Sequence, residues 1–156
     1  MGNPLLSDDT VGLLVIDELK KRPSAKRVHL DFKKNYSGGM DLLDDLIDIE
    51  KAIIVDSIKT GRERPGYCHE FTIENIDEIT QPRIVDAHSL DLLTVLETGE
   101  RCGFSIPKEI RIIGIEGTEY SEFSEKPTPA VMQGMELAIE KIIKQINAWC
   151  HDDVMV

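Results

Sequence analysis

The chain has 156 residues, a length that predicts one domain over residues 1–156 with a hydrophobic core large enough to fold without disulfides. Its formal net charge of −11 at pH 7 argues against general affinity for nucleic acid or anionic membranes, because both kinds of partner require basic patches. No stretch approaches the ~20 apolar residues of a membrane span, and nothing resembles a signal peptide. The three cysteines form no CxxC pair, so we expect reduced thiols in a cytoplasmic protein.

The first part of the chain is predicted to alternate helices and strands after a turn-forming N-terminal loop. In chain order, the apolar pattern predicts a helix from Val11 to about Lys21, a short strand over Val28–Phe32, a helix over Met40–Ile49 and a strand over Ala52–Ile58. The last run is continuously apolar except for Asp56, as expected of a strand that is buried on both faces.

The second part continues the alternation. The predicted segments are a charged loop over Lys59–Gly66, a strand over Tyr67–Ile73, an ambiguous stretch over Ile76–Arg83, a helix from His88 to about Thr98, a buried strand over Glu109–Ile115, a polar loop over Glu116–Pro129 and a final helix that starts near Thr128. The final helix has an apolar stripe at helical spacing: Val131, Met135, Ala138, Ile139, Ile142, Ile146 and Trp149. Strands that alternate with helices predict an α/β fold with a mainly parallel sheet covered on both sides.

Two acidic residues and one histidine are predicted to meet at one edge of this sheet. Asp9 lies in the N-terminal loop, Asp56 closes a buried strand, and His88 leads into a helix. In open α/β sheets, sites form outside the carboxyl ends of the strands, where such segments converge. Two carboxylates and one imidazole suit a divalent transition metal with open coordination positions.

Each of these residues also has a purely structural interpretation. Ser7, Asp8 or Asp9 can cap the first helix, and one carboxylate is enough for a cap. Asp56 can cap the loop after its strand, although a buried carboxylate without a partner is costly. His88 alone reads as a structural or surface histidine. Other potential ligands are interpreted as structural or incidental: His29, Cys68, His69, Glu70, Cys150 and His151.

The N-terminal loop carries a resemblance to a known family. Residues 2–12, Gly-Asn-Pro-Leu-Leu-Ser-Asp-Asp-Thr-Val-Gly, resemble the Gly-Asn-x-Leu-x-x-Asp-(Asp/Glu)-x-x-Gly signature of the hydrogenase maturation endopeptidases. Three further segments follow in the family's order and at roughly its spacing: Gly38–Leu43, Ala52–Asp56 and Asp86–Leu90. The resemblance covers the chain from Gly2 to about Trp149.

The resemblance implies a three-layer α/β/α sandwich and an endopeptidase that cleaves the C-terminal extension of a nickel-loaded nickel–iron hydrogenase large-subunit precursor. It maps the family's metal-binding triad onto Asp9, Asp56 and His88, whose catalytic roles are not separable from metal binding. No cysteine joins this set, so we expect weak binding of free nickel and recognition of nickel in the substrate. The implied partner is the precursor, and we expect a monomer that binds neither nucleic acid nor membranes.

The chain departs from the family at its first residue. Family members have a buried strand immediately before the Gly-Asn pair, whereas Met1 stands almost at that point. We therefore expect a truncated first strand, and the loss of a central strand exposes backbone N–H and C=O groups. Two other functions stay open: a non-cleaving nickel-checkpoint or chaperone-like protein of the same fold, and phosphate binding by the N-terminal loop. Asp8 and Asp9 argue against phosphate because they would repel it.

Overall fold

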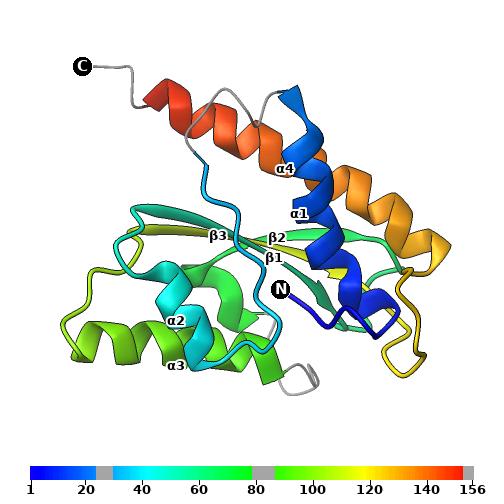
Figure 1. Cartoon of the computed structure of the whole chain (residues 1–156), viewed down its shortest axis with the longest axis horizontal. Helices are drawn as coiled ribbons and strands as arrows, with labels where there is room; N and C mark the ends of the chain where they lie inside the picture. Colours follow the sequence, from blue (N-terminus) through cyan, green and yellow to red (C-terminus); the bar gives the residue numbers. More distant parts are fainter. Residues whose placement is uncertain (24–29, 79–86, 153–156) are drawn as a thin grey trace.

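The computed structural model describes residues 1–23, 30–78 and 87–152, which form helices on both faces of a small sheet (Figure 1). In chain order the elements are the 3₁₀ helix η1 (Asp8–Thr10), the helices α1 (Val11–Lys21) and α2 (Met40–Leu46), the strands β1 (Lys51–Ile58) and β2 (Cys68–Thr72), the 3₁₀ helix η3 (Ile73–Glu78), the helix α3 (Ala87–Arg101), the strand β3 (Glu109–Glu116) and the helix α4 (Pro129–Asp152). None of the described helices is both long and apolar enough to span a bilayer.

The sheet has the strand order β1-β3-β2. β1 and β3 are parallel, with Lys51 opposite Glu109, as expected of two strands that α3 connects. β2 is antiparallel to β3, with Cys68 opposite Ile115. β2 follows β1 through a loop without a helix, so the chain turns back instead of crossing over. The sheet is therefore mixed, and the parallel expectation is confirmed for β1 and β3.

Alternating side chains of the strands build two separate apolar cores. Val55 of β1 and Ile113 of β3 pack with residues of α1 and α4 on one face. Ile54 and Ile112, the neighbours of these residues in the sequence, pack with residues of α2 and α3 on the other face. Residues that alternate in a strand point to opposite faces, so both faces are covered. This arrangement confirms the predicted three-layer α/β/α sandwich (Figure 1).

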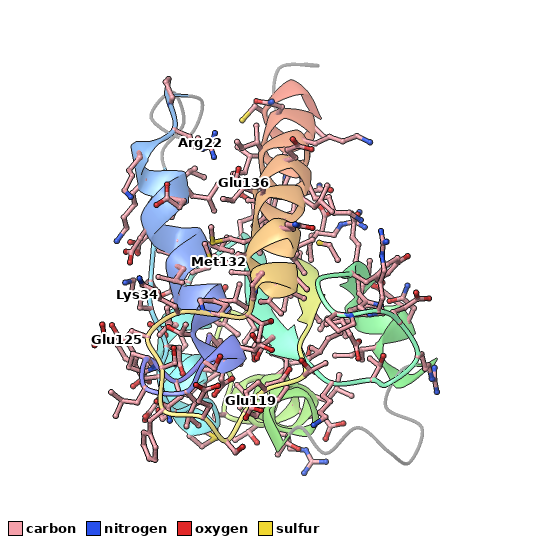
Figure 2. All side chains as sticks on the ribbon, turned by 90° about the vertical axis from the view of Figure 1, so that its right-hand side faces the viewer. Arg22, Lys34, Glu119, Glu125, Met132 and Glu136 are labelled. Atoms are coloured by element: carbon pink, nitrogen blue, oxygen red, sulfur yellow. The ribbon has the colours of Figure 1, made fainter. Side chains whose placement is uncertain are left out.

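The final helix lies where its apolar stripe predicts. Six of the seven stripe residues are buried: Val131, Met135, Ala138, Ile139, Ile142 and Ile146. α1 packs alongside α4, and Figure 2 shows Arg22, just beyond α1, near Glu136 of α4. Their side chains form an ion pair at 2.8 Å, but both are about half exposed, so this pair adds little to the packing of the two helices.

Two sequence predictions in the first part of the chain are wrong. The segment Leu30–Phe32, the described part of the predicted strand, has no strand pairing; Val28 and His29 lie outside the described residues. The second helix ends at Leu46 because Ile47 has an extended ψ of 135°, and Asp48 follows with a positive φ of 60° that an α-helix cannot continue. Of the ambiguous segment, residues 76–78 belong to η3 and the rest lies outside the described residues.

The edge of β1 that faces away from β3 has no strand partner among the described residues. Here the amino group of Met1 donates a hydrogen bond to the carbonyl oxygen of Val55. Leu30–Phe32 has no strand pairing because a strand requires a hydrogen-bonded neighbour, and none lies beside this segment in the part of the chain that the structure describes.

Candidate functional site

Two close backbone approaches hold the N-terminal loop against the carboxyl end of β1. A Cβ atom on Gly12 would lie 2.2 Å from the carbonyl oxygen of Met1 and 2.7 Å from that of Val55. A Cβ atom on Gly2 would lie 1.9 Å from the carbonyl oxygen of Asp9. Gly2 also has a φ of 139°, which side-chain-bearing residues rarely adopt. Both glycines are therefore required to bring Asp9 to the end of β1.

A serine joins the two predicted carboxylates. The Ser57 hydroxyl donates to Oδ1 of Asp9 at 3.0 Å, and the Ser57 backbone N–H donates to Oδ1 of Asp56 at 2.9 Å. The other oxygen of Asp9 accepts the backbone N–H of Asn3 at 3.2 Å. Asp56 is 7 % exposed, whereas Asp9 is partly buried. The structure thus brings Asp9 and Asp56 together, and sequence reasoning missed the serine between them.

Asp8 contacts a different part of the chain from Asp9. It is fully buried, and its carboxylate accepts the backbone N–H groups of Thr118, Glu119 and Thr128 at 2.7–2.9 Å. Neither η1 nor α1 has a side-chain hydrogen bond at its N-cap, so the prediction that Ser7, Asp8 or Asp9 caps the first helix is wrong. Asp8 instead ties the N-terminal loop to the loop between β3 and α4.

The amino group of Met1 lies near the carboxylates of Asp56 and Asp9. Burial lowers the pKa of this group, while the nearby carboxylates of Asp56 and Asp9 act in the opposite direction and raise it. A loop residue closes the other side, because the N–H of Gly2 donates to the carbonyl oxygen of Asn35 at 3.3 Å. Because the N–H of Gly38 donates to Oδ1 of Asn35 at 2.7 Å, this contact also brings the Gly38–Gly39 turn to the rim of the site.

His88 is the second residue of α3, and its side chain lies outside the described part of the structure. The loop after α3 lies beside the start of β1, because Asp48 and Lys108 form backbone hydrogen bonds that join the two segments. The first turn of α3 therefore lies toward the opposite end, where Asp56 closes β1 (Figure 1). Among the described side chains, no group of three histidines, cysteines or acids could hold a metal.

His69, interpreted from the sequence as structural or incidental, pairs with a buried carboxylate farther across the sheet. Nε2 of His69 is 3.1 Å from Oε2 of Glu116, a glutamate that is 2 % exposed. Glu116 also accepts hydrogen bonds from the Thr60 hydroxyl and the Gly61 N–H at 2.7 and 2.8 Å. These contacts satisfy the buried carboxylate and pin the β1–β2 loop, so they explain Glu116 structurally. No signal in the sequence shows that His69 and Glu116 meet, because only the antiparallel pairing of β2 with β3 brings them together.

The cysteines do not supply a nucleophile to this edge. Cys68 is buried in the core on the α1 and α4 face, and burial raises the pKa of its thiol to about 11. The site therefore offers carboxylate oxygens, a serine hydroxyl and backbone donors. Two carboxylates held side by side can accept hydrogen bonds, bind a cation or take up a proton from water.

Comparisons with known proteins agree on one family. The hydrogenase maturation protease family model matches residues 14–145. The Hydrogenase 2 maturation protease of Escherichia coli K12 is 27% identical over 147 residues, which are 94% of this chain and 87% of that protein. The hydrogenase expression/formation protein HupD of Rhodobacter capsulatus is 21% identical over 96% of this chain and 70% of its own length.

Solved structures show the same similarity. The hydrogenase maturating endopeptidase HybD from E. coli superposes with a TM-score of 0.78 at 25% identity, covering 94% of this chain and 88% of that chain. The nickel–iron hydrogenase maturation protease HybD from Thermococcus kodakarensis gives a TM-score of 0.66 at 28% identity, with 92% and 93% covered.

Proposed function

Because the chain belongs to the hydrogenase maturation protease family, we propose that it cleaves the C-terminal extension of a nickel-loaded nickel–iron hydrogenase large-subunit precursor. The observation that supports this proposal is the pair of carboxylates, Asp9 and Asp56, that Ser57 holds together at the carboxyl end of β1. The pair joins two segments 47 positions apart (56 minus 9) at the edge where α/β folds place their sites.

In this proposal nickel belongs to the substrate. Asp9, Asp56 and His88 contact nickel that the precursor already holds, and carboxylate and imidazole groups suit such an ion. The chain contributes no thiolate to this set, so in this proposal the site contacts the nickel while the precursor keeps it bound. Weak binding of free nickel follows from the same donor set.

The chain's own residues hold the two carboxylates of the site in place. Ser57 fixes the orientation of both carboxylates, and the N–H of Asn3 fixes the second oxygen of Asp9. Carboxylates held in this way are preorganised, so little reorganisation is needed when a cation approaches. Nickel supplies Lewis acidity toward a carbonyl or water when it is present. We assign no single residue as the general base.

The test measures the mass of the large subunit. The protein is incubated with large-subunit precursor, with and without nickel loading, and the large subunit is analysed by mass spectrometry. Loss of a C-terminal peptide from the nickel-loaded precursor alone is the expected result. Cleavage of both precursor forms would show that nickel is not the trigger, and no cleavage of either form would contradict the protease assignment.

A non-cleaving nickel checkpoint is the second candidate. The observation that favours it is that β1 pairs only with β3 among the described residues, while its other edge beside the site accepts a hydrogen bond from the amino group of Met1. A strand edge held by few hydrogen bonds is less rigid, and catalysis depends on geometry more strictly than binding does. Retained binding of the nickel-loaded precursor with an unchanged mass is the result expected of a checkpoint.

A further inference from the structure

The loop between β1 and β2, residues 59–67, has the opposite charge from the molecule as a whole. This basic loop contains three cations, Lys59, Arg62 and Arg64, and one acid, Glu63, in a chain whose net charge is −11. All four of these side chains are exposed. An exposed patch of one sign attracts a partner surface of the other sign, so the basic loop can select an acidic partner that the rest of this chain would repel.

The basic loop is held in one conformation by a buried glutamate. The carboxylate of Glu116 accepts the Thr60 hydroxyl and the Gly61 N–H at 2.7 and 2.8 Å, and its backbone carbonyl accepts the Gly66 N–H at 2.7 Å. A Cβ atom on Gly66 would lie 2.1 Å from the carbonyl oxygen of Ala130, so the end of the loop packs directly on the start of α4. A loop anchored in this way loses little conformational entropy when a partner binds.

Direct contacts place the basic loop beside the candidate site. The ammonium group of Lys59 donates to the carbonyl oxygen of Thr118 at 3.4 Å, and the N–H of Thr118 donates to Asp8, the neighbour of Asp9, at 2.9 Å. Lys59 also follows Asp56 by three positions, which span about 10 Å in an extended chain. A partner segment bound to the basic loop therefore lies within a few residues of a peptide bond at the site.

We propose that the basic loop binds an acidic segment of the hydrogenase large-subunit precursor and thereby positions the precursor at the carboxylate pair; this inference rests on the proposed function. Arginine side chains suit this task because a guanidinium group can donate two parallel hydrogen bonds to one carboxylate. Complementary charges at the edge of an interface mainly speed association and select the partner. The basic loop is thus a determinant of substrate specificity outside the reacting groups.

Acidic residues of the loop between β3 and α4 limit the place of this segment. Lys59 lowers the pKa of the Glu119 carboxyl, although hydrogen bonds from Ser121 contribute more, so these two charges partly offset each other. Glu122 lies farther along, where its carbonyl oxygen accepts an N–H of the N-terminal loop, and Figure 2 shows Glu125 well apart from Glu119. The acidic segment therefore contacts the arginines of the basic loop and not the loop after β3.

The carboxylates of the candidate site impose a second limit. Asp9 and Asp56 repel an acidic segment, so this segment lies to the side of the basic loop and not between the two carboxylates. The net charge of −11 also repels a long polyanion such as nucleic acid. A short acidic stretch of protein is the partner that these charges favour.

The test uses two neighbouring exposed positions of opposite charge. We expect Arg64→Glu to raise KM for the nickel-loaded precursor roughly threefold or more at low salt, and Glu63→Lys to lower it, with kcat unchanged in both. High salt should remove these differences because it screens exposed charges. Changes of KM in the same direction in both variants would indicate a merely structural role for the loop and would overturn the proposal.

Lys144→Glu is the matched control, because it changes the net charge by the same amount as Arg64→Glu. Lys144 is exposed on α4, about 22 Å along the helix from Pro129. Its substitution should leave KM within the error of the unmodified chain. A rise in KM equal to that of Arg64→Glu would show that net charge matters and the basic loop does not, which would also overturn the proposal.

A binding measurement separates this inference from the protease assignment. Immobilised nickel-loaded precursor is titrated with the unmodified chain, with hexaglutamate or hexaglutamine as competitor. Hexaglutamate should weaken binding of the unmodified chain and have less effect on Arg64→Glu. Such binding without any cleavage would contradict the protease and leave the basic loop as a docking site, whereas cleavage with no effect of hexaglutamate would refute the docking site alone. Stronger competition by a short single-stranded DNA than by hexaglutamate would reassign the loop to nucleic acid and refute the proposal.

Discussion

Two neighbouring aspartates in the N-terminal loop differ in what their carboxylates contact. Asp8 accepts three backbone N–H groups and is fully buried, so its charge is satisfied within the protein. Asp9 is partly buried and accepts only two hydrogen bonds, from Ser57 and Asn3, among the contacts that the structure describes. Asp8 is thus a structural clamp, while Asp9 keeps the capacity to bind a ligand.

Asp8→Asn is expected to lower the free energy of unfolding by about 2–3 kcal/mol, because the amide nitrogen cannot accept the backbone N–H groups that the carboxylate binds. Denaturant unfolding measures this loss. The control is Glu125→Gln, an exposed position on the same loop that should change stability by less than about 0.5 kcal/mol. Equal stability of the two variants would contradict the clamp.

Asp56→Asn and His88→Ala are each expected to abolish processing of the nickel-loaded precursor while the thermal unfolding midpoint changes little. The reason is that both variants remove a proposed ligand of the substrate's nickel and leave the apolar cores intact. Mass spectrometry of the large subunit measures processing, and calorimetry measures folding.

Asp44→Asn is the matched control for this pair, because Asp44 is exposed on α2 and lies outside the proposed triad. It should process the precursor at the unmodified rate. Full activity of either Asp56→Asn or His88→Ala would break the assignment of the triad.

At the scale of elements, β1 has a strand on one edge only among the described residues. Its side chains reach both apolar cores, yet it pairs only with β3 among the described residues. The segment Leu30–Phe32 has the composition of a strand but no pairing. The free energy of a strand comes largely from its hydrogen-bonded and packed neighbours, so composition alone cannot establish one.

An apolar strand of five or six residues placed before Gly2 is expected to raise the free energy of unfolding by about 2 kcal/mol or more, because it would bury apolar side chains in the cavity lined by Phe32, Ile53 and Trp149 beside β1. Denaturant unfolding of the extended chain measures the gain, and hydrogen exchange of Ile53 should slow. A glycine–serine extension of the same length controls for added chain. Equal stability of the two extensions would show that the open edge of β1 needs no further strand.

At the scale of the whole molecule, the net charge of −11 opposes self-association through the sheet edge. We expect light scattering to give a mass of 17.6 kDa at low and high protein concentration in moderate salt. A mass that doubles with concentration would contradict the monomer and would indicate pairing between two open edges of β1.

The sequence by itself determined the α/β class, the positions of β1, β3 and α4, and the adjacency of Asp9 and Asp56. These features follow from apolar periodicity and from the rule that loops converge at the carboxyl ends of parallel strands. Only the tertiary structure decided the task of Asp8, because its three partners lie 110–120 positions away. It also decided that Ser57 contacts both Asp9 and Asp56, and that Leu30–Phe32 forms no strand. Contacts between distant segments set these features, and no local pattern encodes such contacts.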